Sequence, residues 1–154
     1  MKHYALLAAA LMSIAACQPA ATTTATTSAA ATAAPSFNVQ ALAENDIQIQ
    51  GCTRSLSRTG ATDTIFAEDG VDTGAKGIIR IDGQLINVSL TAGTGDEQHS
   101  NRNFADAAHT LAIVENLTTG AAHEESDSVE ESGTLAVTYK GTTQTIQVEG
   151  GVAC

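Results

Sequence analysis

The sequence contains no tryptophan, and aromatic residues make up only 3% of its 154 residues. Cations are scarce as well, because seven Lys and Arg stand against seventeen Asp and Glu, which gives a formal net charge of −10 at pH 7. This deficit argues against nucleic acid as a partner, since binding to phosphates needs an excess of positive charge. The length allows one small acidic domain.

Proline and glycine are each missing from a different part of the chain. Both prolines precede residue 36, whereas all thirteen glycines lie between Gly51 and Gly151. Glycine and proline mark turns and breaks in regular structure, so a change in their distribution indicates a change in organisation. The sequence therefore divides into three parts, which are residues 1–16, 17–36 and 37–154.

The first part, 1–16, has the features of a secretory signal peptide. A short cationic start is followed by an apolar run that is too short to span a membrane permanently. The run leads to Ile14-Ala15-Ala16-Cys17, which resembles the lipobox of bacterial lipoproteins. An ordinary signal peptide that is cut near Ala16 is the alternative.

The lipobox resemblance implies a cellular location. In that family the Cys that matches Cys17 is acylated and becomes the mature N-terminus, which implies a lipid anchor in a membrane of the cell envelope. A residue other than Asp after the Cys, here Gln18, favours the outer membrane. The rest of 17–36 is rich in Ala and Thr and lacks both charge and an apolar stripe, so we expect a disordered tether.

The third part, 37–154, lacks apolar runs with the period of a helix and shows alternation of apolar and polar residues instead. Ile86, Val88 and Leu90, for example, alternate with polar neighbours. The pattern predicts an all-β domain, either a small antiparallel β-barrel or a two-sheet sandwich, of about seven strands. The strands are expected near 46–52, 63–68, 77–82, 85–91, 110–116, 134–140 and 143–149.

Two dipeptides between these strands predict tight hairpins. Asp82-Gly83 and Lys140-Gly141 each separate two alternating runs, and both suit the positive φ angles of a type I′ turn. Lys is less tolerant of a positive φ than Asp, so the second signal is the weaker one. The longer segments 92–109 and 118–132 are rich in Gly, Asn, Ser and acids, and we expect them to be surface loops.

Cysteine use adds one long-range constraint. With Cys17 committed to lipid, Cys52 and Cys154 remain as an even pair in an oxidising compartment, and we predict a disulfide between them. Such a bond would hold the C-terminal strand beside the first strand, which suits a closed barrel. A redox-active or nucleophilic Cys is the alternative, although no Cys-x-x-Cys pair or evident activating partner supports it.

The domain carries no recognisable catalytic or metal-binding motif. Neither a Gly-x-Ser-x-Gly nor a His-Glu-x-x-His pattern occurs. The loop histidines His99, His109 and His123 have spacings of ten and fourteen residues, which match no compact zinc motif. The sequence therefore predicts a binding or structural module with no catalytic residues, metal or cofactor. An envelope enzyme or a ligand-capture domain is the competing class, and a deep pocket with converging polar groups would favour it.

The acids of the two expected loops are interpreted as a hydrated surface patch that would attract a basic protein. No Lys or Arg occurs between residues 103 and 139. The patch comprises Asp96, Glu97, Glu124, Glu125, Asp127, Glu130 and Glu131, with Glu115 nearby in the sequence.

A lipobox, a Cys at the first strand and a Cys at the C-terminal end together resemble the layout of the membrane-bound inhibitor of c-type lysozyme, a family of small eight-stranded barrel lipoproteins. The segment 100–104, which reads Ser-Asn-Arg-Asn-Phe, falls where that family has a Ser-Gly-x-x-Tyr loop. The resemblance makes Ser100, Arg102 and Phe104 candidates for contact with a partner and implies a basic protein such as lysozyme. The Gly and Tyr of that loop are replaced here, and the family's tryptophan-containing stretch is absent.

Overall fold

The computed structural model describes residues 36–48, 51–69, 74–96 and 98–154. The expected signal peptide, Cys17 and the tether up to residue 35 lie outside the described residues, as do Glu97 and residues 49–50 of the first expected strand. Within the described ranges, no helix has the length and apolar character needed to cross a membrane.

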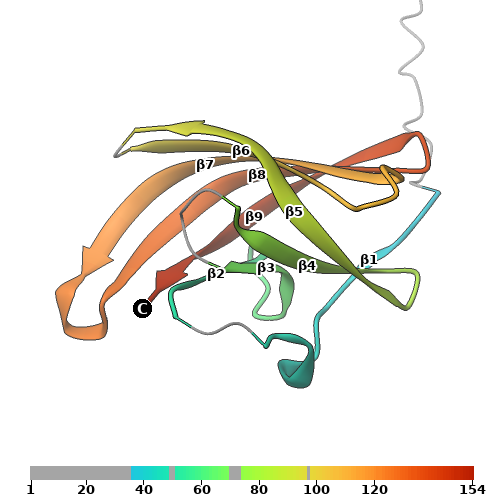
Figure 1. Ribbon diagram of the computed structural model, residues 1–154. Coiled ribbons are helices and arrows are strands. Elements are labelled where there is room, and N and C mark those ends of the chain that lie inside the picture. The colour runs from blue at the N-terminus through green and yellow to red at the C-terminus, as the bar shows by residue number, and fades with distance from the viewer. Residues whose placement is uncertain (1–35, 49–50, 70–73, 97) are drawn as a thin grey trace, which may run out of the picture. The chain divides into compact units, whose positions relative to one another are not determined.

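Nine antiparallel strands of the described chain form one sheet, and eight of them close into a barrel (Figure 1). The spatial order is β1-β4-β3-β2-β9-β8-β7-β6-β5, and an additional pairing of β4 with β5 closes the barrel. The all-β prediction is therefore confirmed, and a barrel replaces the alternative of a two-sheet sandwich. The elements are β1 (Val39–Gln40), η1 (Glu44–Asp46), β2 (Thr53–Arg58), β3 (Thr64–Asp69), β4 (Lys76–Ile81), β5 (Gln84–Gly95), β6 (His99–Ala105), β7 (Leu111–His123), η2 (Glu124–Ser126), β8 (Ser128–Tyr139) and β9 (Thr142–Ala153).

Both predicted hairpin turns are present. Asp82 and Gly83 have φ angles of 49° and 82° between β4 and β5, and Lys140 and Gly141 have 48° and 83° between β8 and β9. Two successive positive φ angles are typical of a type I′ turn, whose twist matches that of the flanking strands. The two hairpins lie at the same end of the barrel, because β4 and β8 both run toward it (Figure 1).

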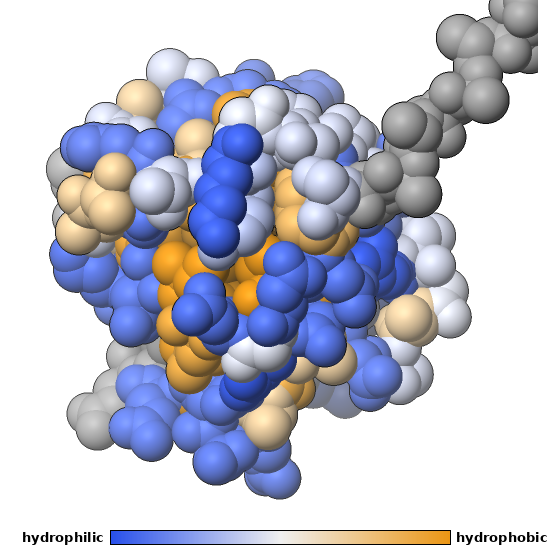
Figure 2. Space-filling view, turned by 90° about the vertical axis from the view of Figure 1, so that its right-hand side faces the viewer, coloured by the Kyte–Doolittle hydropathy of each residue, from blue (hydrophilic) through white to orange (hydrophobic). Residues whose placement is uncertain are grey.

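The first described residues of the chain cover this end of the barrel. We call it the closed end. The ring of Phe37 packs edge-on against that of Tyr139, with 5.7 Å between the ring centroids. Asn38 and Asp82 exchange hydrogen bonds, and β1 then pairs with the last residues of β4. Figure 2 views this end and shows a hydrophobic area surrounded by hydrophilic residues. The apolar core therefore extends to the closed end.

The opposite end of the barrel, which we call the open end, is formed by the start of β2, β6 and β8 and by the last residues of β3, β5, β7 and β9. The predicted bond between Cys52 and Cys154 lies here, with an S–S distance of 2.03 Å and 4.0 Å between the Cα atoms. The bond links the residue before β2 to the residue after β9, and these two strands are neighbours in the sheet. The disulfide prediction is confirmed.

The first expected strand, 46–52, is wrong. Asp46 belongs to η1, and the described residues 47–48 and 51–52 are not in a strand. The first barrel strand is β2, whose inward residues include Arg54 and Leu56, 3% and 0% exposed. It escaped prediction because a buried charged residue interrupts the apolar alternation on which the prediction relied.

The two expected surface loops are also wrong over most of their length. The segment 92–109 contains the end of β5 and all of β6, and the segment 118–132 contains the end of β7 and the start of β8. Their small and polar residues reflect their place at the open end, where the inward positions hold charged side chains such as Arg102 and Glu131. Barrel strands in this region therefore lack the apolar face that identifies a strand in sequence.

Candidate functional site

Five charged side chains project into the barrel near the open end, and we call them the charged cluster. Each occupies an inward position of its strand, and inward positions recur at every second residue. Arg54 precedes Leu56 in this way, and Glu115 follows Ile113. The members are Arg54 on β2, Glu68 on β3, Arg102 on β6, Glu115 on β7 and Glu131 on β8, all between 0% and 7% exposed.

Arg54 is the centre of the charged cluster. Its Nε and Nη2 donate to Oε2 and Oε1 of Glu131 at 2.6 and 2.9 Å, which is a bidentate pair. Its Nη1 donates to Oε1 of Glu68 and, at 3.2 Å, to Oε1 of Glu115. Arg102 Nη1 also donates to Glu68. Charge-assisted bonds of this kind are strong, and a guanidinium fork suits bidentate contact with a carboxylate.

Burial shifts the ionisation of the charged cluster. It raises the pKa of Glu115 to about 8, with the nearby Glu68 carboxyl as a second cause and the two arginines as opposing ones. Burial also raises the pKa of Glu68, although Arg54 and Arg102 oppose the shift. Burial disfavours the charged form of Arg54, but its hydrogen bonds to Glu131 and the charges of Glu115 and Glu68 outweigh this and raise its pKa.

These shifts favour the protonated forms of Glu115 and Glu68, which lowers the negative charge that the carboxyl groups bring into the barrel. Oε2 of Glu115 and Oε2 of Glu68 are buried and have no hydrogen-bond partner in the described part of the chain. An ionised carboxylate with half of its acceptors unsatisfied is costly to bury, so this geometry agrees with the raised pKa of both groups.

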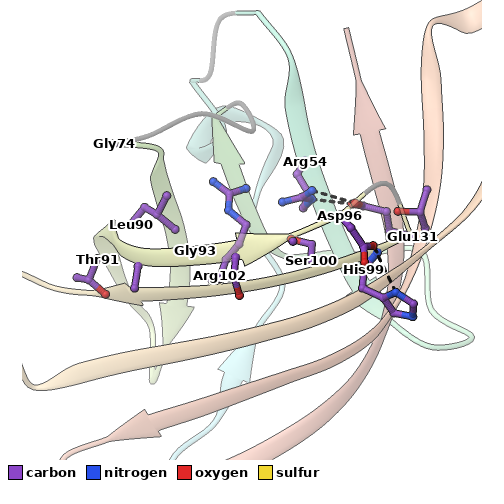
Figure 3. A pocket seen from close by; sticks show the side chains of 14 residues that line it. Arg54, Gly74, Leu90, Thr91, Gly93, Asp96, His99, Ser100, Arg102 and Glu131 are labelled. Atoms are coloured by element: carbon purple, nitrogen blue, oxygen red, sulfur yellow. Dashed lines mark hydrogen bonds and ion pairs between the residues drawn. The ribbon is translucent and has the colours of Figure 1, made fainter.

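A pocket of about 440 Å³ opens beside the charged cluster at the open end (Figure 3). Arg54, Arg102 and Glu131 are part of its lining, and the residues 91–95 at the end of β5 form another part. Glu68 and Glu115 do not line it. The pocket therefore gives access to the bidentate pair and to Arg102, but not to the carboxyl with the pKa near neutrality.

The structure places the three residues predicted to contact a partner on inward positions of β6. Ser100 and Arg102 line the pocket. Phe104 lies in the core at 1% exposure, where its ring packs edge-on against Phe66 with 5.4 Å between the centroids. Arg102 also stacks over the ring of Phe104, with 5.2 Å from its Cζ to the centroid. Phe104 therefore packs against the guanidinium of Arg102 from the core side, and its buried ring is not available for contact with a partner.

The three histidines do not come together. His99 Nδ1 lies 3.5 Å from Asp96 Oδ1, and His123 Nε2 lies 2.9 Å from Glu130 Oε1. His109 is in the turn between β6 and β7 with a φ of 54°. Among the residues that the structure describes, no three metal-ligating side chains form a group.

The expected acidic patch is partly wrong. Glu115 and Glu131 are buried members of the charged cluster, at 0% and 7% exposure. Glu130 is exposed on the outer face of β8, because successive strand residues point to opposite faces. The remaining described acids of the patch are exposed at the tips of the hairpins, namely Asp96, Glu124, Glu125 and Asp127.

The charged cluster itself was not foreseen in the sequence, although one signal for it exists. Arg54 is two residues from Leu56, and Glu115 lies between Ile113 and Leu117, all of them buried. In an alternating run, a charged residue at a position where an apolar residue is expected indicates a charged side chain that points into the barrel. Such a buried charge needs a partner of opposite charge, which here comes from another strand.

Comparison with known proteins does not assign this site to a family or an activity. No protein-family model, curated protein or solved structure matches the chain.

Proposed function

We propose that the protein is a bacterial cell-envelope lipoprotein, anchored through lipid on Cys17, whose barrel is a binding module. The observation that carries the binding role is the pocket at the open end, on which polar side chains from β2, β6 and β8 converge. The described chain begins at Ser36, at the closed end. An anchor upstream of Ser36 would therefore be joined to the closed end, opposite the end at which the pocket opens.

The chemistry of the pocket supports binding over catalysis. Arg54 and Glu131 hold each other in a bidentate pair, so neither is poised to move a proton. Ser100 and His99 both line the pocket, but no hydrogen bond joins them in the described chain, and a nucleophile needs a base within hydrogen-bond reach. The fixed polar groups are suited to orienting a ligand.

The lipid anchor gives a direct test of the location. We expect metabolic labelling with a palmitate analogue to label the wild-type protein and the Cys154→Ser variant, and to leave the Cys17→Ser variant unlabelled. The Cys154→Ser variant is the matched control, because it removes a cysteine that is expected in the disulfide. Label that persists in Cys17→Ser would overturn the lipoprotein assignment.

Inhibition of c-type lysozyme is the second candidate function. A closed eight-stranded antiparallel barrel is the fold that the resemblance to the lysozyme-inhibitor family implies. Exposed acids at the tips of the hairpins, including Asp96 and Glu125, would favour encounter with a basic protein. Of the three candidate contact residues in this segment, Ser100 is partly exposed, Arg102 lines the pocket at 5% exposure, and Phe104 is buried.

Under this candidate function, residues 37–154 without the lipid anchor, which we call the soluble domain, should bind a c-type lysozyme at low salt and block its activity. Binding should weaken as salt rises, because exposed charges are screened beyond about 8–10 Å at physiological ionic strength. Calorimetry together with a cell-wall lysis assay measures both effects. Binding without inhibition would mean that charge alone brings the proteins together, and no binding at low salt would remove this candidate.

A further inference from the structure

The end of β5 has an edge beside which no strand of the described residues lies, and we call it the β5 edge. Pairing of β4 with β5 ends where Lys76 faces Ser89, followed by one hydrogen bond of 2.9 Å from Leu90 N–H to the carbonyl of Ala75. Pairing of β5 with β6 continues to Gly95. Thr91–Gly95 therefore has β6 on one side and no strand of the described chain on the other, and all five residues are exposed.

Glycine supplies the backbone groups that face outward along the β5 edge. Asp96 donates its N–H to the carbonyl of His99 at 2.9 Å. In an antiparallel ladder, residues bonded to the partner strand alternate with residues directed away from it. The N–H and C=O groups of Gly93 and Gly95 therefore point away from β6, while those of Thr94 point toward it.

Among the residues that the structure describes, none gives the β5 edge the usual protection of an exposed strand. Natural edges are blocked by charged side chains, proline or bulges, because an open row of backbone groups pairs readily with another chain. A register shift lies at the start of this edge, between Leu90 and Ala92, but the following residues are small and uncharged. Such an edge suits strand addition, in which backbone hydrogen bonds give affinity and pockets select side chains.

The pocket lies directly beside this edge. Residues 91–95 are part of its lining, and Gly93 occupies an inward position opposite Arg102. Because glycine has no side chain, nothing from Gly93 or Gly95 fills the pocket; a Cβ added at Gly93 would have Arg102 Cγ as its nearest neighbour, at 3.7 Å. Alternate side chains of an added strand would point into this space, toward Arg102 and the Arg54–Glu131 pair (Figure 3).

The charges at the open end select the kind of strand. The exposed acids there are Asp96, Glu124, Glu125, Asp127 and Glu130, and the exposed cation in the described chain at this end is Lys76. A basic segment is therefore attracted to the open end, whereas a second copy of the chain would bring the same acids together and be repelled.

We propose that the β5 edge binds an extended, basic peptide segment of another protein by strand addition, with alternate side chains directed into the pocket. This inference rests on the proposed binding role of the open end, and it adds the class of ligand and its mode of binding.

The test uses a fluorescent decapeptide of alternating Lys and Thr, a control peptide of equal charge in which Pro replaces Thr, and the soluble domain. We expect the Lys-Thr peptide to bind at low salt and the Pro-containing peptide to bind at least about tenfold more weakly, because Pro cannot donate to a ladder. The variant Gly93→Pro removes an outward N–H and keeps the bonds to β6, so it should weaken binding of the Lys-Thr peptide to a similar extent. Thermal unfolding checks that the variant is folded.

The variant Gly93→Val distinguishes the contribution of the backbone edge to peptide binding from that of the pocket. It keeps the N–H of residue 93 and adds a side chain to the pocket wall. Equal binding of the two peptides, unchanged binding by Gly93→Pro, or no peptide binding at all would overturn strand addition. A wild-type dimer in sedimentation that becomes monomeric in Gly93→Pro would also overturn it, in favour of a second copy. Peptide binding that is lost in Gly93→Val and retained in Gly93→Pro would overturn strand addition while leaving the proposed binding role of the pocket intact.

Discussion

Replacing Arg54 by Met is expected to lower the free energy of unfolding by ~3–5 kcal/mol, because it leaves buried carboxyl groups without their cation. Glu131 would lose both of its hydrogen bonds to the guanidinium, and Glu115 would lose its bond to Nη1. Glu68 would keep the bond from Arg102. Urea denaturation of the soluble domain measures the loss, with the disulfide intact in both proteins.

Arg58→Met on the same strand is the matched control. Arg58 is half-buried and donates from Nη2 to the carbonyl of Val39 at 2.9 Å, a single contact with a neutral acceptor. We expect its replacement to cost about 1 kcal/mol. A second substitution, Glu131→Leu in the Arg54→Met background, should recover part of the loss, because it removes one of the carboxyl groups left unpaired. Equal losses for Arg54→Met and Arg58→Met would contradict the central role of Arg54.

The parts of the fold that were predicted from the sequence are those set by local chemistry. Asp82-Gly83 and Lys140-Gly141 determine their turns within four residues, so both hairpins could be predicted. The long apolar alternation of β5 around Val88 and of β8 around Val137 identified two of the barrel strands. The disulfide could be predicted because, with Cys17 set aside, only one pairing of cysteines was possible.

The charged cluster could not be predicted in the same way, because its contacts are not local. Arg54 meets Glu131 across 77 positions of sequence and Glu115 across 61. The alternation rule counts apolar residues, so it treats Arg54 and Glu131 as evidence for an exposed loop. The pocket depends on the same strands and on small residues such as Gly93. A glycine in the sequence does not by itself indicate a pocket, because the pocket forms only when the strands close into the barrel.

The stability of the domain should depend on pH through Glu115. Burial, with Glu68 as the second cause, raises the pKa of this carboxyl from 4.5 to about 8 in the folded barrel. Between these values the folded state holds a proton that the unfolded state has released. The free energy of unfolding contributed by Glu115 therefore falls as pH rises through this window, by at most about 1.4 kcal/mol per pH unit, and levels off above the folded pKa.

The variant Glu115→Gln isolates this contribution, because the amide has the shape of the protonated acid and cannot ionise. Near pH 5 the variant and the wild type should have similar stability, and the variant should become more stable by a few kcal/mol as pH approaches ~9. The other charged groups around this side chain, Arg54, Glu68, Arg102 and Glu131, are the same in both proteins, so the difference between the two curves reports Glu115. Glu125→Gln, at an exposed position of η2, is the control that removes one negative charge from the surface. A difference between wild type and Glu115→Gln that stays constant from pH 5 to 9, like that of the control, would mean that Glu115 is ionised inside the barrel.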